Sequence, residues 1–213
     1  MSRLRFRISI SLDGFVAGPD QSVENPIGVG GMQLHEWVFP LAVWRTMQGL
    51  EGGEVNESTA VIERQLSGIG ATVMGRHMFG GPPGPWDLTA PWNGWWGKNP
   101  PFHHPVFVIT HFPRDPLMME GGTVFSFITG GIGTALERAR TAASGKDVAL
   151  AGGASVARQY LKAGLVDDMD LALVPVLLGR GERLFDGITD LHGLEPVRAI
   201  AAPGVMHLAF GRR

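Results

Sequence analysis

The stretch Val148-Ala-Leu-Ala-Gly152-Gly153-Ala-Ser-Val-Ala157 joins a short apolar run to a segment of helical pattern through two adjacent glycines. It predicts a buried strand over 148–151 and a helix over 155–163 that ends at Gly164. Glycine lets a phosphate approach the backbone, and a helix N-terminus favours an anion through its free N–H groups and its dipole. A structural turn that binds nothing is the alternative interpretation. The stretch is not a GxGxxG fingerprint and gives no support to an ordinary Rossmann fold.

A second turn of this kind occurs earlier, where an expected strand over 71–74 runs into Gly75-Arg76-His77. The planar guanidinium of arginine matches phosphate oxygens, and histidine can donate a hydrogen bond or stack on a base. The alternative is an exposed arginine in a solvated loop. Two glycine turns at strand ends of one sheet suit a ligand with phosphates at two places, such as a dinucleotide with an extra 2′-phosphate.

Outward from these turns, strand-like and helical runs alternate along the chain, which is typical of an α/β fold. A helical pattern over 34–50 is interrupted by Pro40, which must break or kink it. The chain shows no linker, internal repeat or low-complexity segment, so a single domain over 1–213 is expected. The other expected strands are 4–11, 106–110, 123–127, 171–178 and 205–210, and the other expected helices are 59–67 and 132–143.

Residues 80–105 form a proline- and tryptophan-rich segment that is far longer than an ordinary loop. Its tryptophans could line a substrate pocket, pack the loop onto the protein or form an interface. The expected strand over 171–178 is apolar on both faces. Together the two segments predict a homodimer, and the alternative is that the chain's own helices cover both faces of the strand.

Composition excludes several classes of protein. The 213 residues are 44% hydrophobic and 18% charged, enough for a sizeable core. The 18 basic and 20 acidic side chains form no block of like charge, which argues against nucleic-acid binding. The chain has no cysteine, which excludes disulfides, thiolate metal sites and cysteine nucleophiles. The histidines lack a metal-binding spacing, so no metal is expected, and no Gly-x-Ser-x-Gly elbow points to a serine hydrolase.

The sequence also predicts where the protein works. No apolar run approaches the roughly 18 residues that a membrane span needs, and the first residues lack the hydrophobic region of a signal peptide. We therefore expect a cytoplasmic protein that acts on a small-molecule substrate and has no membrane or nucleic-acid partner.

Five motifs occur in a characteristic order: Ser9-Ile-Ser-Leu-Asp-Gly14, Met74-Gly-Arg-His77, Ala151-Gly-Gly-Ala154, Gly164-Leu-Val-Asp-Asp168 and Pro175-Val-Leu-Leu-Gly-Arg-Gly181. Together they resemble the dihydrofolate reductase-like fold. In particular they resemble the reductase (C-terminal) domain of the bifunctional riboflavin-biosynthesis deaminase–reductase and its stand-alone relatives. The resemblance covers almost the whole chain and implies a central, mostly parallel sheet flanked by helices.

The resemblance implies NADPH as the hydride donor. It places Arg76 and His77 against the 2′-phosphate and adenosine, with Thr110 and His111 holding the adenosine half. Met78 stands where dihydrofolate reductases usually carry threonine or serine. The other cofactor contacts implied are Ser9, Val16 and Ala17 beside the nicotinamide, Gly75 at the strand end, and Ala151, Gly152, Gly153, Ala154, Ser155 and Val156 along the pyrophosphate and nicotinamide ribose.

The resemblance further implies hydride transfer to a small heterocyclic or ribosyl substrate, as in riboflavin-type reductases. Dihydrofolate reductases hold the pterin with an acid on the first helix and a threonine on a later strand. Here Leu173 falls at the threonine position, which argues against strict folate reduction. Asp13 and Glu36, acting through a water, are the candidate proton donors. A pterin-type reductase and a non-catalytic nucleotide- or drug-binding module on the same fold are the alternatives.

Overall fold

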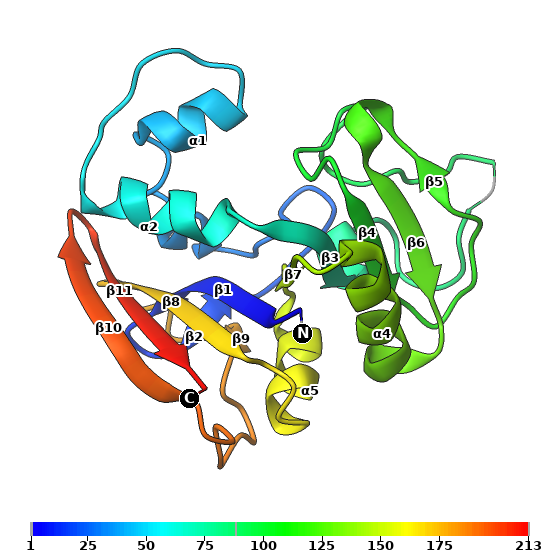
Figure 1. Ribbon diagram of the computed structural model, residues 1–213. Helices are drawn as coiled ribbons and strands as arrows, with labels where there is room; N and C mark the ends of the chain where they lie inside the picture. The colour runs from blue at the N-terminus through cyan, green and yellow to red at the C-terminus, as the bar shows by residue number, and fades with distance from the viewer. Residues whose placement is uncertain (1, 88, 213) are drawn as a thin grey trace. The chain divides into compact units, whose positions relative to one another are not determined.

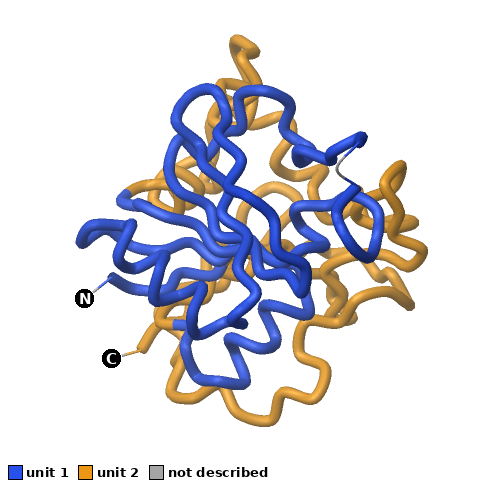
Figure 2. The backbone as a smooth tube through the Cα atoms, turned by 90° about the vertical axis from the view of Figure 1, so that its right-hand side faces the viewer, with its two compact units in different colours: residues 1–6, 68–166 blue, residues 7–67, 167–213 orange. Residues whose placement is uncertain are grey.

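A computed structural model describes residues 2–87 and 89–212 of the chain. The chain divides into two compact units, each built from separate stretches of sequence (Figure 2). Unit 1 comprises residues 1–6 and 68–166, and unit 2 comprises residues 7–67 and 167–213. Strand β1 (Leu4–Ser11) begins in unit 1 and ends in unit 2. The alternation of strands and helices confirms the predicted α/β class.

Unit 1 contains the mostly parallel sheet that the sequence predicts (Figure 1). Its parallel strands are joined by crossovers, which place their carboxyl ends at one edge of the sheet. The order is the start of β1, β7 (Asp147–Leu150), β3 (Ile69–Gly75), β4 (Pro105–Ile109), β6 (Val124–Ile128) and the antiparallel β5 (Leu117–Met118), with the short turn η2 (Glu120–Gly122) between β5 and β6.

Two helices pack on this sheet. Helix α4 (Gly131–Ala143) contacts β3 and β4 and buries Ala135 and Ala139, which recur at the four-residue spacing of one helix face. Helix α5 (Ala154–Lys162) begins directly after the glycine pair and buries Tyr160, whose hydroxyl donates to the carbonyl of Ile132 at 2.8 Å. This bond ties α5 to the start of α4.

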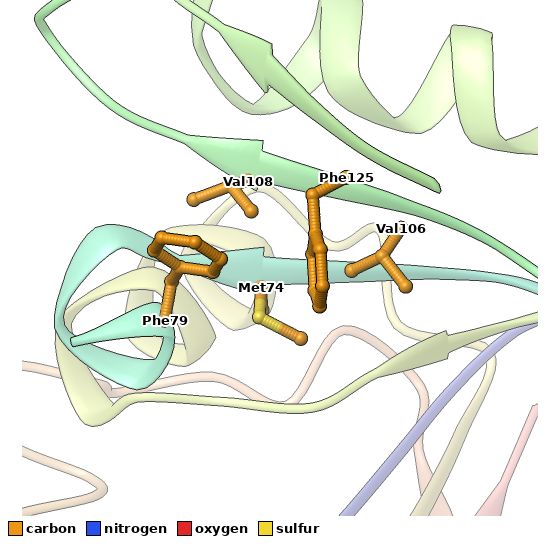
Figure 3. Close-up of a cluster of buried hydrophobic side chains, with 5 residues drawn as sticks. All are labelled: Met74, Phe79, Val106, Val108 and Phe125. Atoms are coloured by element: carbon orange, nitrogen blue, oxygen red, sulfur yellow. The ribbon is translucent and has the colours of Figure 1, made fainter. Parts of the chain in front are cut away.

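A cluster of five buried side chains lies on the strands of unit 1 and the short helix α3 (Arg76–Phe79) (Figure 3). Trp86, Trp92 and Trp96 of residues 80–104, called here the Trp-rich loop, pack against this cluster. The loop therefore serves as a cover for the sheet, which is the loop-packing interpretation of its tryptophans. The cluster consists of Met74, Phe79, Val106, Val108 and Phe125.

Unit 2 is built on antiparallel strands. β8 (Asp168–Val174) pairs with β11 (Val205–Gly211), and β11 pairs with β10 (Glu195–Ala202). A second, two-stranded sheet joins β2 (Phe15–Ala17) to β9 (Glu182–Arg183). The helical elements of the unit are η1 (Gly31–Leu34), α1 (Ala42–Met47) and α2 (Glu57–Leu66).

Pro40 breaks the helical pattern over 34–50, as expected, and leaves turns between η1 and α1. Two other expectations in unit 2 need correction. The apolar run 171–178 is a strand only as far as Val174, because Pro175 has no N–H for the ladder. β10 was not predicted; it is an edge strand whose first five residues are exposed, so its sequence lacks a buried alternating face.

Candidate functional site

The two glycine turns singled out by the sequence lie side by side in unit 1. The N–H of Gly75 at the end of β3 donates to the carbonyl of Gly152 at 2.8 Å. The N–H of Ala151 donates to the carbonyl of Val73 at 2.9 Å, which continues the pairing of β7 with β3 beyond the last ladder pair. The carboxyl edge of this sheet therefore presents the Gly152-Gly153 turn and the Arg76-His77 turn together.

The glycines of the two turns have different surroundings. A Cβ atom built on Gly75 would lie 2.8 Å from Cγ2 of Val156, so packing against α5 leaves no room for a side chain. A Cβ atom on Gly152 or Gly153 would meet no heavy atom within 4 Å. Gly152 also has a φ of +106°, which favours glycine. The backbone of the glycine pair thus faces open space that a ligand can enter.

Helix α5 begins at this open turn. Its first three residues are Ala154, Ser155 and Val156, of which only Ser155 is exposed. The first turn carries no acidic side chain. The N–H groups of a first helical turn have no partner within the helix and carry partial positive charge. Ala154 and Val156 can contribute only backbone to a ligand here, whereas Ser155 can also offer its hydroxyl. The arrangement suits an anionic group such as a phosphate.

Arg76 is the first residue of α3 and is half-buried, whereas the neighbouring His77 is exposed. The Arg76 guanidinium carbon lies 3.6 Å from the ring centroid of Trp86, and the group donates to the carbonyls of Gly80 and Pro82. Burial lowers the pKa of Arg76, and the positive charge of Arg114 lowers it further. The guanidinium is thus held at the sheet edge by neutral groups.

Thr110 and His111 follow β4 at the same edge, because Ile109 pairs in parallel with Gly75. Thr110 is buried; its N–H donates to the carbonyl of Ile128 at 3.0 Å and its hydroxyl oxygen accepts from the N–H of Phe112 at 3.2 Å. His111 is exposed. The side chain of Thr110 is therefore partly committed to the turn, and His111 is open to solvent.

The remaining predicted site residues belong to unit 2. Ser9 is buried and its hydroxyl accepts from Nε1 of Trp37 at 3.3 Å. Val16 and Ala17 are buried in β2. Glu36 is exposed and lies in turns that follow η1, so it is not a helix residue as the sequence suggested.

Asp13 is engaged by its own unit. Its carboxylate accepts the hydroxyl of Ser11 at 2.6 Å and the N–H groups of Leu178 and Gly179 at 3.2 Å and 2.7 Å. The hydrogen bond from Ser11, followed by those from the backbone, lowers the pKa of Asp13. A carboxyl group that is ionised and satisfied in this way is a poor proton donor, so the environment favours a structural role for Asp13.

Two residues at the carboxyl edge of unit 1 could not be assigned a role from the sequence. Arg114 follows β4 and its guanidinium carbon lies 5.0 Å from the ring centroids of both Trp86 and Phe127. The only signal in the sequence was a basic residue shortly after an expected strand end. Trp86 was considered for a pocket lining, but the spacing of the loop gave no means to place it beside two arginines.

Two classes of site are not found in the part of the chain that the structure describes. Among residues 2–87 and 89–212, no three histidine or acidic side chains gather in a way that could hold a metal ion. No helix within those residues is both long and apolar enough to cross a membrane.

The fold is of the dihydrofolate reductase-like class. It is similar to dihydrofolate reductase from Enterococcus faecalis complexed with NADP(H), with a TM-score of 0.52 and 12% identity over 99% of this chain and 96% of that chain. The chain belongs to the RibD C-terminal domain family, whose model matches residues 3–202 and so spans both units. This confirms the resemblance that the five motifs suggested.

Other solved structures agree on the fold. A candidate riboflavin biosynthesis protein from Shewanella sp. PV-4 is 19% identical over 100% of this chain and 99% of its own length, with a TM-score of 0.60. A diaminohydroxyphosphoribosylaminopyrimidine deaminase/5-amino-6-(5-phosphoribosylamino)uracil reductase from Thermotoga maritima is 11% identical, with a TM-score of 0.55. This chain is covered completely in that comparison and spans 57% of the Thermotoga protein. No curated protein matches the chain.

Proposed function

We propose that the protein is an NADPH-dependent reductase that transfers a hydride to the C=N or C=O carbon of a small heterocyclic or ribosyl substrate. The observation that carries the proposal is the pair of neighbouring turns at the carboxyl edge of unit 1. One turn offers open glycine backbone at the start of α5, and the other offers Arg76. A dinucleotide with a pyrophosphate and a separate 2′-phosphate has its anionic groups at two places, which suits the two turns of this edge.

The residues present fit such a cofactor. The space that a side chain on Gly152 or Gly153 would fill is open, so the pyrophosphate can approach the backbone N–H groups of the first turn of α5. Arg76 and His77 would hold the 2′-phosphate, and Thr110 and His111 would contact the adenosine half. When bound, NADPH supplies a hydride. The resemblance of the sequence motifs implied Ser9, Val16 and Ala17 at the nicotinamide end, and we keep these residues as part of the proposal.

The reduction also needs a proton at the substrate heteroatom. Of the two candidate acids, Glu36 has an exposed side chain that water can reach. Asp13 is already hydrogen-bonded to three donors, and its lowered pKa keeps it ionised. We therefore favour Glu36, acting through a water, over Asp13 as the donor.

The family membership supports the substrate class that we propose. The Thermotoga relative carries the name of a reductase that acts on a phosphoribosylamino-uracil, and this chain belongs to the family of the corresponding C-terminal domain. We propose a ribosylamino-pyrimidine substrate of riboflavin synthesis, reduced in the cytoplasm. Leu173 lies in β8 opposite Met206, where neither side chain can hydrogen-bond a pterin, and this favours the pyrimidine substrate over dihydrofolate.

The proposal is tested with the purified full chain. Affinities for NADPH and NADH are measured by fluorescence titration, and oxidation of NADPH is followed with ribosylamino-pyrimidines and with dihydrofolate as substrates. We expect tight NADPH binding and turnover of the pyrimidine. Binding of neither cofactor would overturn the proposal. NADPH binding without turnover of any substrate would instead support a non-catalytic nucleotide-binding module.

A homodimer also remains a proposal, on different grounds from those the sequence offered. Leu171 and Val174 of β8 are buried within the chain itself, and the Trp-rich loop packs on unit 1. β10, however, is an edge strand of unit 2, and Val197 on it and Met206 on β11 are 63% and 42% exposed. Unpaired edge strands with exposed apolar residues favour pairing with another chain. Light scattering that gives the mass of a single chain would contradict this.

A further inference from the structure

The hydroxyl of Ser9 has an unused hydrogen-bond donor. Ser9 lies in the second half of β1, in unit 2, and is 8% exposed. Its oxygen accepts from Nε1 of Trp37 at 3.3 Å. Because the indole nitrogen can only donate, this bond leaves the hydroxyl proton of Ser9 without a use. Within residues 2–87 and 89–212, the side chain of Ser9 makes no other hydrogen bond.

Ser11, two residues further along β1, has a hydroxyl that is satisfied on both sides. It donates to the carboxylate of Asp13 at 2.6 Å and accepts from the N–H of Phe15 at 2.9 Å. Ser11 is 1% exposed, whereas Ser9 keeps a small opening through which a ligand atom can reach it. A buried donor that lacks an acceptor is costly to a fold. The contrast indicates that a ligand supplies the acceptor for Ser9.

Trp37, the partner of Ser9, is held from several sides. Its Nε1 also donates to the carbonyl of Leu34 at 3.0 Å, and its ring packs edge-on against His207 at a centroid distance of 5.1 Å. The ring is half-buried against an apolar cluster that includes Val205. A fixed donor on one side of a hydroxyl oxygen limits the directions that remain for its proton. Trp37 therefore orients the proton of Ser9.

The bond from Trp37 to Ser9 joins two segments of unit 2 that the proposed function uses. Ser9 belongs to the proposed nicotinamide end, and Trp37 follows Glu36, the favoured proton donor, in the turns after η1. The unused proton of Ser9 thus lies in the part of unit 2 where the proposed function requires the reacting rings.

The surroundings indicate the kind of acceptor. The buried side chains around Trp37 are apolar, and a charged acceptor would lose its hydration there. A neutral carbonyl oxygen loses less, and an amide-type carbonyl is present both in the carboxamide of nicotinamide and in a uracil ring. We propose that the hydroxyl of Ser9 donates to an amide-type carbonyl oxygen of a bound ring and that Trp37 is its positioning residue. The inference rests on the proposed function, which supplies both rings.

The first test removes the donor. Ser9→Ala should weaken the interaction with the carbonyl-bearing ring about three- to tenfold, the size of one neutral hydrogen bond. If the carboxamide is the acceptor, NADPH affinity falls and the affinity for 2′,5′-ADP, which has no nicotinamide, stays the same. If the substrate is the acceptor, NADPH affinity stays the same and the KM of the ribosylamino-pyrimidine rises. The fold should survive, because Trp37 keeps its bond to Leu34.

Thr123→Val is the matched control for Ser9→Ala. Thr123 is a buried residue of unit 1 whose hydroxyl accepts from the N–H of His103 at 3.0 Å and donates to the carbonyl of Pro100 at 3.2 Å. Its hydroxyl is therefore satisfied within the fold. The variant should lower the melting temperature and leave the NADPH affinity and the KM as they are in the wild type.

The second test addresses Trp37. Trp37→Phe keeps an aromatic ring but removes the N–H, so the affinity that Ser9→Ala lowers should fall here too. In the Ser9→Ala background, Trp37→Phe should lower that affinity no further, because no hydroxyl remains to be oriented. Additive losses in the double variant would overturn the positioning role. Trp92→Phe is the matched control; it removes a similar bond, from Nε1 to the carbonyl of Phe79 at 2.9 Å, and should leave the affinity unchanged.

The indole proton of Trp37 gives a spectroscopic readout that a purely structural role would not move. Its NMR resonance is assigned by its absence in Trp37→Phe. A hydroxyl that donates a hydrogen bond becomes a stronger acceptor, so this resonance should shift when the carbonyl ligand binds the wild type. A shift of the same size in Ser9→Ala, measured on Trp37, would contradict the inference.

The outcomes separate this inference from the proposed function. Turnover of the pyrimidine by the wild type, with unchanged NADPH affinity and unchanged KM in Ser9→Ala, would overturn the inference and leave the reductase standing. If the wild type neither binds nor oxidises NADPH, free nicotinamide and uracil are titrated by NMR as probes. Binding of either probe that is lost in Ser9→Ala would support the inference while the reductase proposal fails. Binding of neither probe, or equal binding by the variant, would overturn both.

Discussion

The two units use their polar groups in opposite ways. At the carboxyl edge of unit 1, the Gly152-Gly153 backbone faces open space, and among residues 2–87 and 89–212 the hydrogen-bond acceptors of Arg76 and Arg114 are neutral. In unit 2, the buried Ser58 and His207 bond each other at 2.8 Å, and Asp13 accepts three hydrogen bonds from its surroundings. Backbone that faces open space and cations that are bonded only to neutral oxygens are available to an anionic ligand, whereas groups satisfied within the fold hold it together.

The largest expected effect is the loss of NADPH affinity when a side chain fills the open space beside Gly153. Gly153→Val places a branched side chain where the pyrophosphate would lie, so NADPH affinity should fall by at least about a thousandfold, or about 4 kcal/mol. The fold should survive, because a Cβ atom here meets nothing within 4 Å and Gly153 has an ordinary φ of −58°. Titration of NADPH and the melting temperature are measured on the same variant. A large fall in melting temperature with unchanged NADPH affinity would mean that the turn has only a structural role.

The matched variant Gly75→Ala lies at the same edge, where packing is tight, and it should lose stability and not NADPH affinity. Gly75→Ala forces a methyl group to within 2.8 Å of Cγ2 of Val156, which is buried and stiff at χ1. Overpacking of this kind costs up to about 3 kcal/mol of unfolding free energy. Urea denaturation measures it. Stability equal to that of the wild type would show that α5 can move away from β3.

In unit 1, the sequence predicted the features that depend on adjacent residues and missed one that depends on a distant contact. The motif Gly152-Gly153 and the strand-end Arg76 could be found from the chain because a strand, a glycine and a helix start are adjacent in sequence. The α/β class followed from the alternation of strands and helices. The mostly parallel sheet was implied by the resemblance, which the family match confirms. Arg114 could not be found, because its meeting with Trp86 depends on how a loop of 25 residues folds back on the sheet.

In unit 2 the sequence misled for physical reasons. Pro175 ends the strand that was expected over 171–178, and although the break at Pro40 was expected, local periodicity does not show where the helix resumes after it. The sequence pattern assigned no role to His207, which is only 5% exposed in the structure. It lies on β11 opposite Ala172, and strand alternation alone could not tell which face of that strand α2 would cover.

His207 gives the third prediction, which concerns stability and not binding. It bonds Ser58 of α2, packs edge-on against Trp37 at 5.1 Å, and burial with the charge of Arg64 lowers its pKa to about 4. Because the unfolded histidine titrates near pH 6.5, the unfolded state binds the extra proton first as pH falls. Stability is therefore full above pH 6.5 and is lost between pH 6.5 and pH 4.

The expected loss is about 2 kcal/mol, allowing for partial screening by solvent. Urea unfolding of the wild type and of His207→Phe is measured across this range of pH. The variant should be less stable at pH 7, where it lacks the bond to Ser58, and should lose less stability on acidification. Parallel pH curves for the two proteins would show that the acid sensitivity arises at other groups.

The smallest effect is expected at Asp13, although the sequence proposed it as a catalytic acid. A true proton donor contributes about 10²- to 10⁴-fold to turnover, so its replacement by an amide would abolish most activity. In the structure, one carboxylate oxygen accepts from Ser11 and Leu178 and the other accepts from Gly179. Asp13→Asn keeps one acceptor oxygen in the same shape. If the group only ties residues 178–179 to the end of β1, kcat with the pyrimidine substrate should change little and its pH profile should not move. A hundredfold fall in kcat with an unchanged melting temperature would contradict this prediction. It would mean that Asp13 takes part in catalysis although its carboxylate is already hydrogen-bonded.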